Sequence, residues 1–272
     1  MTAPSYPIQL EQWWLDQARQ ATGISDIASC MASLEKDVER LSDLFTLERA
    51  DRFGGYALDE RMLLAYGLFF FPQTFVRVQF VLDEISGLRG LCLPQGRPLR
   101  MLDLGCGSGA ATFAALAQLA ARAPELAVEA TAIDRSRPFL GWTGRVLEAN
   151  RDLWPKAALQ TGEGDLMDYR GDGLWDLVFV SFALNEAMEA RADDEANVWL
   201  GRWLERLAPG GVLVILEPVS QATSERLERL RDWVAGQKLA RILGPCLHHE
   251  SCPLLNKGDV LCHEVRRWRI PE

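Results

Sequence analysis

Long apolar runs are missing from this sequence. The run from Met62 to Phe71, including Gly67, spans ten residues, whereas a helix that crosses a membrane needs about 20. The first ten residues contain no Lys or Arg, so they lack the pattern of a secretory signal or an Arg-rich transit peptide. We therefore expect a cytoplasmic protein with no transmembrane segment.

Positive charge and cysteine are also scarce. The 29 Lys and Arg residues are outnumbered by 38 Asp and Glu, which leaves a net charge of −9. Such a chain does not attract nucleic acid or anionic membranes as a whole, so any RNA contact must use a local basic patch. Six cysteines in 272 residues are too few for a disulfide scaffold.

The remaining composition is that of a folded globular protein, with 48% hydrophobic and 25% charged residues. Apolar residues recur at three- and four-residue spacing from Leu10 to about Leu88, which predicts an all-helical N-terminal region. A stretch rich in Gly and Pro, 87–98, then breaks the pattern. We predict a helical cap region at 1–95, a nucleotide-binding domain at 96–243 and a Cys/His-rich tail at 244–272 that completes the sheet.

Strand-like and helix-like segments alternate after residue 98, which predicts an α/β fold with a doubly wound, Rossmann-like parallel sheet. The expected strands are Leu99–Leu104, Val128–Ile133, Ala158–Thr161, Asp176–Ser181 and Gly211–Glu217. The expected helices cover about Gly109–Arg122, Pro138–Asn150, Asp194–Leu207 and Ser224–Gly236.

A glycine-rich loop follows the first expected strand, with Gly105, Gly107 and Gly109 preceded by Asp103. Glycines let the backbone approach a ligand closely, and the start of a helix offers unpaired N–H groups. The spacing is G-x-G-x-G, whereas dinucleotide-binding folds use G-x-G-x-x-G. We therefore reject an NAD-dependent dehydrogenase. Asp134, directly after the second strand, can accept both ribose hydroxyls of an adenosine.

These residues resemble the class I S-adenosylmethionine-dependent methyltransferases. The resemblance implies S-adenosylmethionine as cofactor, with the glycine loop and Asp103 as the first motif and Asp134 on the ribose. Asp165 and Leu166, in Gly164-Asp165-Leu166, resemble the adenine-side motif after the third strand. Leu207 to Gly211, with the sequence Leu-Ala-Pro-Gly-Gly, resembles the turn before the fifth strand.

A closer resemblance runs from about Tyr56 to Trp268. Its markers are Phe71-Pro72-Gln73-Thr74-Phe75, Ser181 to Glu186, the Glu217-Pro218 pair, and the segments around Cys246, Cys252 and Cys262. They are similar to the methyltransferase-like family of the mitochondrial small ribosomal subunit and its bacterial relatives. That resemblance implies methylation of small-subunit ribosomal RNA or a role in ribosome assembly, and an iron–sulfur ligand set in the tail.

The tail departs from the family pattern in two ways. Leu247 replaces a proline of the family's Pro-Cys-Pro-His, and the chain lacks both the fourth tail cysteine and the basic stretch beyond it. The residues themselves offer Cys246, Cys252 and Cys262 as soft ligands, with His263, His248 or His249 as a fourth. This set suits zinc or an iron–sulfur cluster; alternatively, the three are reduced cysteines near a final strand.

The methyl acceptor is expected over the ends of the first and fourth strands. Ser181, Asn185 and Glu186 follow the fourth strand and are our candidate catalytic residues, which would orient the acceptor or remove its proton. The alternative for Asn185 and Glu186 is that they only cap the helix that follows. Cys246 falls after a further helix and beside other cysteines, so we interpret it as a ligand and not as a nucleophile.

Three functions remain open from the sequence. The resemblance favours an RNA methyltransferase, and the acidic charge and the missing basic stretch favour a small-molecule methyltransferase. The third is a ribosome assembly factor that keeps the cofactor fold without catalysis. Arg266, Arg267 and Arg269 form the basic cluster near the end of the chain, a small footprint for RNA.

Overall fold

The computed structural model describes residues 6–46, 59–88, 90–189, 191–258 and 260–269. Tyr56 lies outside these ranges. The N-terminal elements are α1 Ile8–Thr22, α2 Ile27–Thr46, α3 Glu60–Ala65, the π-helix η1 Tyr66–Phe70 and α4 Phe71–Gly87. They are followed by β1 Leu99–Leu104, α5 Ala110–Arg122, β2 Val128–Asp134, α6 Arg137–Ala149, η2 Arg151–Leu153 and β3 Ala157–Glu163. The last elements are β4 Trp175–Ser181, α7 Leu184–Ala187, α8 Asp193–Glu205, β5 Leu207–Leu216 and α9 Gln221–Gln237.

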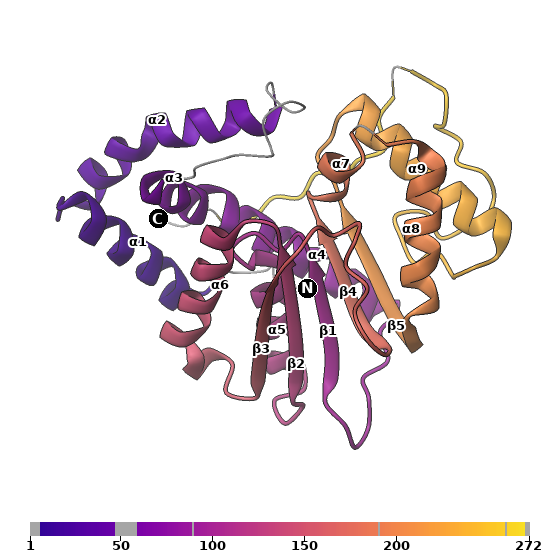
Figure 1. Ribbon diagram of the computed structural model, residues 1–272, viewed down its shortest axis with the longest axis horizontal. Helices are drawn as coiled ribbons and strands as arrows, with labels where there is room; N and C mark the ends of the chain where they lie inside the picture. Colours follow the sequence, from indigo (N-terminus) through magenta and orange to yellow (C-terminus); the bar gives the residue numbers. More distant parts are fainter. Residues whose placement is uncertain (1–5, 47–58, 89, 190, 259, 270–272) are drawn as a thin grey trace.

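The five strands form one parallel sheet in the order β3-β2-β1-β4-β5, with β1 at the centre (Figure 1). The chain winds outward from β1 in one direction to β3 and then returns past β1 to β4, as in a Rossmann-like fold. The reversal leaves a crevice at the carboxyl ends of β1 and β4. β5 begins at Leu207, earlier than expected, and its register against β4 shifts between Trp175 and Leu177. Pro209 and the glycines after it therefore lie within the strand and not in a turn before it.

Alternate strand residues bury the two faces of the sheet against different helices. On one face, Met101, Leu177 and Phe179 pack in a single core with residues of α4, α5 and α6. On the other face, Leu102, Leu104, Val178 and Val180 pack against α8 and α9. This two-residue alternation is what a sheet covered on both faces requires, so the doubly wound prediction is confirmed.

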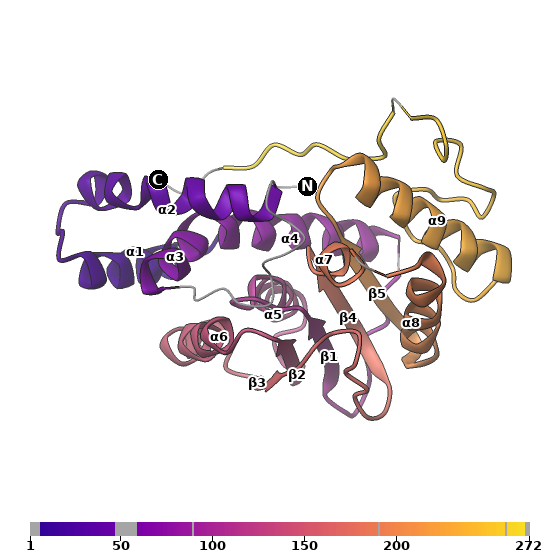
Figure 2. The same cartoon turned by 45° about the horizontal axis from the view of Figure 1, so that its top comes forward.

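The N-terminal helices share the first of these cores. Trp14 of α1, Leu34 of α2 and Phe75 of α4 are all fully buried there beside Phe113 of α5. Figure 2 shows α4 lying beside α5 above the sheet, with α1, α2 and α3 extending from its end. The helical region therefore does not pack as a body of its own, and α4 is part of the layer that covers the sheet.

The tail does not complete the sheet, which corrects our expectation. Its described residues contain no strand, and it runs along α9 and then back across the molecule toward α4 (Figures 1 and 2, yellow). Side chains of α9 meet its backbone instead: Asp232 accepts the Cys252 N–H at 2.8 Å, and Arg231 donates to carbonyls of the tail. Because these groups are satisfied by side chains, the segment needs no strand ladder.

The far end of the tail fastens onto the N-terminal region. Arg266 forms an ion pair with Glu84 of α4 and lies over the ring of Phe80. Trp268 packs against the core that α4 shares with the sheet. Among the described residues, no helix is both long and apolar enough to cross a membrane.

Candidate functional site

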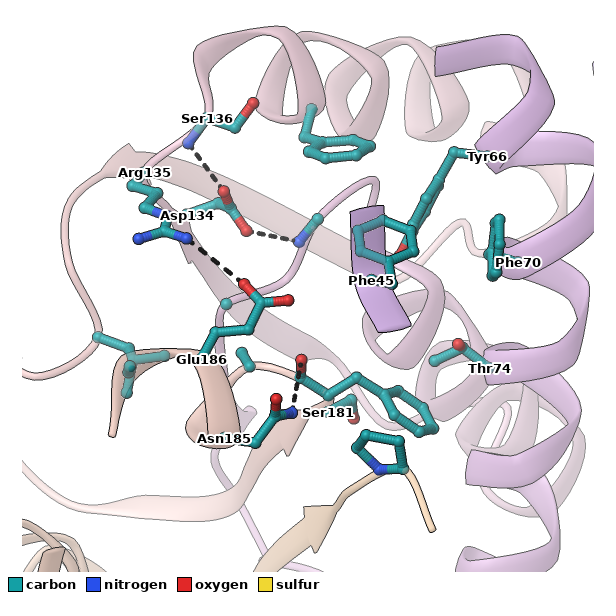
Figure 3. A pocket seen from close by; sticks show the side chains of 18 of the residues that line it. Phe45, Tyr66, Phe70, Thr74, Asp134, Arg135, Ser136, Ser181, Asn185 and Glu186 are labelled. Atoms are coloured by element: carbon teal, nitrogen blue, oxygen red, sulfur yellow. Dashed lines mark hydrogen bonds and ion pairs between the residues drawn. The ribbon is translucent and has the colours of Figure 1, made fainter. Parts of the chain in front are cut away.

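A cavity of about 900 Å³ lies at the carboxyl ends of the strands, where the sheet meets the N-terminal helices. Loops after β1, β2, β3 and β4 form one wall. The other wall comes from α2, η1 and α4, as Figure 3 shows for Phe45, Tyr66, Phe70 and Thr74. Eight of the residues predicted from the sequence line the cavity: Gly105, Gly107, Asp134, Asp165, Leu166, Ser181, Asn185 and Glu186.

The glycine loop has the backbone geometry that its residues allow. Gly105 and Gly107 have φ angles of +74° and +53°, which residues with a Cβ rarely adopt. Gly109 lines no part of the cavity; a Cβ there would come within 2.8 Å of Phe113 and 2.9 Å of Thr143. We therefore assign Gly109 a structural role in place of the predicted binding role: the absence of a side chain lets the loop lie close to α5 and α6.

Asp103 also lies behind the loop and does not line the cavity. Its side chain is fully buried, and Oδ2 accepts hydrogen bonds from the Thr112 N–H at 3.1 Å and the Thr112 hydroxyl at 2.7 Å. Burial raises the pKa of Asp103 to about 7. Asp103 therefore connects β1 to the first turn of α5 and supports the glycine loop from behind.

Asp134 is the acid that the structure directs at the loop. One carboxylate oxygen accepts the Gly107 N–H at 2.8 Å and the other accepts the Ser136 N–H at 2.8 Å. Burial raises the pKa of Asp134. Asp165, at the end of the neighbouring strand, accepts the Met167 N–H at 2.7 Å and lines the same wall. Two carboxylates therefore stand at the ends of β2 and β3, beside the glycines that follow β1.

Ser181, Asn185 and Glu186 gather on the β4 side of the cavity (Figure 3). The Ser181 hydroxyl is buried and has no hydrogen-bond partner among the described residues. Phe182, between Ser181 and α7, has a φ of +60°, which is unusual for an aromatic residue. Its N–H donates to the Leu216 carbonyl at 2.7 Å. This strained turn brings the start of α7 over the cavity.

Glu217 is a functional candidate that the sequence reasoning did not assign. It accepts the backbone N–H groups of Leu184 at 3.0 Å and Asn185 at 3.2 Å, and also the Asn185 side-chain amide. Asn185 and Glu186 therefore do not cap α7, because Glu217 from the end of β5 does so. The Asn185 side chain is held with its N–H groups occupied. The Glu217-Pro218 pair was the available signal.

Two carboxyl groups on the β4 side of the cavity, those of Glu186 and Glu217, are hard to ionise. Burial, followed by the charges of Glu217 and Asp134, raises the pKa of Glu186 to about 8, although Arg135 at 3.4 Å lowers it. Burial raises the pKa of Glu217 to about 7. A cationic ligand placed among these groups would favour their charged forms. These carboxyl groups thus favour a positively charged group of a ligand beside them, although Arg77, Arg135 and Arg137 also line the cavity.

The wall opposite the sheet is mainly apolar. It is lined by Leu41, Leu44, Phe45, Tyr66, Phe70 and Thr74, with Phe139 from the start of α6. The aromatic members contact one another: the centroid of the Tyr66 ring lies 4.8 Å from that of the Phe139 ring and 5.7 Å from that of the Phe70 ring. Tyr66 and Phe70 therefore lie at the cavity surface.

The tail cysteines lie beside α9, away from this cavity. The Cys252 N–H donates to Asp232, and the Cys262 backbone donates to Glu228, one helical turn earlier on α9. The pKa of Cys262 is raised by burial and then by Cys246 and Cys252. His263 Nδ1 lies 2.9 Å from the Leu261 carbonyl. In the described part of the chain, no three His, Cys, Asp or Glu side chains are arranged to hold a metal ion.

The sheet order, the glycine loop after β1 and the acids after β2 and β3 together define a Rossmann-like α/β fold with a cavity at the carboxyl ends of its strands. A family model described as mitochondrial small ribosomal subunit Rsm22 matches residues 60–270. The chain therefore belongs to the Rsm22 family. No curated protein matches the sequence.

Several solved structures resemble this chain. A putative class I S-adenosylmethionine-dependent methyltransferase from Listeria monocytogenes is 12% identical, over 84% of this chain and 78% of that one, with a TM-score of 0.43. N-methyltransferase NodS from Bradyrhizobium japonicum, in complex with S-adenosyl-L-homocysteine, is 20% identical over 66% and 71%, with a TM-score of 0.38. DesVI from Streptomyces venezuelae is 20% identical over 62% and 61%, with a TM-score of 0.40. The chain therefore spans less than two thirds of the length of DesVI.

Proposed function

We propose that this protein is an S-adenosylmethionine-dependent methyltransferase that acts on small-subunit ribosomal RNA within a ribosomal particle. The observation that supports S-adenosylmethionine as the cofactor is the cavity itself. Its wall places Asp165, Asp134 and Gly107 in the order of β3, β2 and β1. An adenine, a ribose and an amino-acid tail can occupy that row in sequence.

The residues fit this cofactor on three counts. Gly107 has no side chain, and a Cβ at this position would lie 3.2 Å from the hydroxyl oxygen of Tyr66. Asp134 and Asp165 offer acceptors for hydroxyl and amino groups. The raised pKa values of Glu186 and Glu217 suit the approach of a cation. When bound, S-adenosylmethionine supplies an electrophilic methyl group attached to a positively charged sulfur.

The chain's own residues then position the acceptor. Methyl transfer is an in-line displacement, so orientation alone can contribute about 7–11 kcal/mol. The Asn185 side-chain carbonyl oxygen lines the cavity from the β4 side and can accept from an N–H or O–H group. The Ser181 hydroxyl, which has no hydrogen-bond partner among the described residues, lies buried in the same wall. Glu217 fixes Asn185. Glu186, once ionised, can accept the proton that the acceptor loses.

Ribosomal RNA as the acceptor is supported by membership of the Rsm22 family. Arg77, Arg135 and Arg137 line the cavity and provide positive charge at its edge. The net charge of −9 argues against strong binding of free RNA, since affinity for phosphates grows with the number of basic contacts. We therefore propose that a ribosomal particle supplies further contacts.

A small-molecule acceptor is the second candidate, and the apolar aromatic wall formed by α2, η1 and α6 favours it. A cavity of about 900 Å³ is large enough for both a cofactor and a small ring-containing substrate. A third candidate is a ribosome assembly factor that binds the cofactor without transferring the methyl group.

We further propose that Cys246, Cys252 and Cys262 bind one zinc ion or iron–sulfur cluster. The support is that the backbone N–H groups of Cys252 and Cys262 bond to side chains one turn apart on α9, and that Cys246 and Cys252 add to the effect of burial in raising the pKa of Cys262. Three cysteines leave one position of a tetrahedral site to another ligand. His263 is the residue that we assign to it.

Calorimetry tests the cofactor assignment. S-adenosylmethionine and S-adenosyl-L-homocysteine should both bind to the purified protein, and NADH should not. Binding of NADH with comparable affinity, or no binding of either adenosyl ligand, would show that the nucleotide assignment is wrong.

A further inference from the structure

The N-terminal helices bring the hydroxyl of Tyr66 over the glycine loop, beside Gly107. It begins η1, a π-helical turn inserted between α3 and α4, and such turns are frequent at functional sites. The next residue, Gly67, lies against the ring of Trp14, where a Cβ would come within 2.2 Å of a ring carbon. Trp14 therefore occupies the core side of the turn, and Tyr66 projects from it into the cavity (Figure 3).

The ring of Tyr66 is held in place by aromatic neighbours. Phe70 stacks beside it with ring centroids 5.7 Å apart, and Phe139 meets it edge-on at 4.8 Å. Phe45 also approaches edge-on, with ring centroids 6.2 Å apart. With three sides of the ring in contact, the hydroxyl has a fixed direction, toward Gly107.

The hydroxyl itself makes no hydrogen bond with any residue that the structure describes. The groups around it are acidic: Asp134, Glu186, Cys106 and Asp103 all raise the pKa of Tyr66, after the larger effect of burial. The phenol is therefore neutral, and its O–H group can donate a hydrogen bond to an anionic group of a ligand. Arg77, Arg135 and Arg137 also line the cavity, but Arg135 is paired with Glu186 and Arg137 with Glu163.

The order of the strands indicates which part of the ligand reaches Tyr66. Asp165 follows β3 and Asp134 follows β2, so an adenine and a ribose on these acids leave the amino-acid portion over the loop after β1. Gly107, directly beneath the Tyr66 hydroxyl, belongs to that loop.

We propose that Tyr66 is a cofactor-binding residue whose hydroxyl donates a hydrogen bond to the carboxylate of the cofactor's amino-acid portion. The inference rests on the proposed function, since it requires that S-adenosylmethionine occupies the cavity. It also gives the N-terminal helices a direct role in the site, because α1 and η1 position a ligand-binding residue that the sheet does not provide. No sequence motif marks this residue.

Binding calorimetry with a pair of thioether ligands tests the proposal without any turnover. S-adenosyl-L-homocysteine carries the amino-acid portion, and 5′-methylthioadenosine lacks it. A hydrogen bond to a charged group contributes about 1.5–3 kcal/mol, so Tyr66→Phe should weaken S-adenosyl-L-homocysteine about 10- to 100-fold. The affinity for 5′-methylthioadenosine should stay unchanged. Decarboxylated S-adenosyl-L-homocysteine should likewise bind both proteins equally.

Tyr169→Phe is the matched control, because Tyr169 packs on Trp203 and lines no part of the cavity. It should bind all three ligands like the wild type. Equal binding of S-adenosyl-L-homocysteine by wild type and Tyr66→Phe would overturn the inference and leave the proposed function intact. Equal weakening of 5′-methylthioadenosine would also overturn it, since the hydroxyl would then act on the nucleoside. If the wild type binds none of the ligands, the proposed function itself fails.

Discussion

At the scale of single residues, Asp134 carries the nucleotide assignment. Both of its oxygens already accept backbone N–H groups, from Gly107 and Ser136, so the carboxylate is fixed where a ribose would lie. The position directly after an apolar strand predicted this residue from the sequence. Asp103 followed the same motif, yet its burial behind the loop and its bonds to Thr112 give it a supporting role that sequence spacing does not reveal.

Asp134→Ala should weaken S-adenosyl-L-homocysteine about 10- to 100-fold, because one charge-assisted interaction of about 1.5–3 kcal/mol is lost. Calorimetry measures the change. Asp152→Ala, an exposed acid in η2 outside the cavity, is the control and should bind as the wild type does. An Asp134→Ala protein with wild-type affinity would contradict the assignment.

Glu186 makes stability depend on pH in the ligand-free protein. Its pKa of about 8 is above the ordinary value for Glu, so the folded state holds a proton that the unfolded state has lost. The contribution of this proton to the free energy of unfolding is fully present below about pH 4.5 and is lost as the pH rises to about 8. The melting temperature should therefore fall across this range by about 2–4 °C for each kcal/mol lost.

Glu186→Gln isolates this effect, because it keeps the shape of the side chain and removes the titration. Its melting temperature, measured by calorimetry between pH 5 and pH 9, should fall less steeply than that of the wild type. Parallel curves for the two proteins would show that Glu186 ionises normally.

At the scale of elements, the sequence predicted what depends on short-range pattern. The apolar runs of β1, β2 and β4 and the glycines after β1 lie where expected, because burial on both faces and a tight turn leave a direct mark on residue type. Three features depend on contacts between distant residues and were not predicted: the π-helical turn η1, the capping of α7 by Glu217, and a tail that follows α9 and has no strand among its described residues.

The turn at η1 depends on Gly67, so its replacement gives an element-scale test. A Cβ at Gly67 would lie 2.2 Å from a ring carbon of Trp14. Gly67→Ala should therefore destabilise the protein by about 1–3 kcal/mol, the usual cost of overpacking a core. Urea unfolding measures the free energy.

Gly141→Ala in α6 is the matched control, because a Cβ there meets nothing within 4 Å. Alanine is about 0.5–1 kcal/mol more favourable than glycine in a helix, so this variant should be at least as stable as the wild type. Equal stabilities of the two variants would show that Trp14 does not constrain the turn.

At the scale of the whole molecule, the tail joins parts that are distant in sequence. It is fastened to α9 where Asp232 accepts the Cys252 N–H and to α4 through the Arg266–Glu84 ion pair, with Cys262 between these anchors. Freshly and anaerobically prepared protein should contain about one zinc ion or cluster per chain by metal analysis and absorbance. Three freely titratable tail thiols and no metal would contradict the proposed ligand set.

The molecule's charge limits how it can meet RNA. With a net charge of −9, the isolated protein should bind free RNA weakly, with an affinity that falls steeply as salt is added. A ribosomal particle, which brings its own proteins and a fixed RNA shape, removes the need for a broad basic surface. We therefore propose RNA within a ribosomal particle, and not free RNA, as the acceptor.

The most direct test of the central claim is to follow the methyl group. The protein is incubated with methyl-labelled S-adenosylmethionine and, in separate reactions, small-subunit particles, free small-subunit RNA or a metabolite extract, with Asp134→Ala as the control with weakened cofactor binding. We predict label in the RNA of the particles, much less in free RNA, and slower labelling by Asp134→Ala when the cofactor is below saturation. Label found only in small molecules, or in no acceptor at all, would contradict the claim.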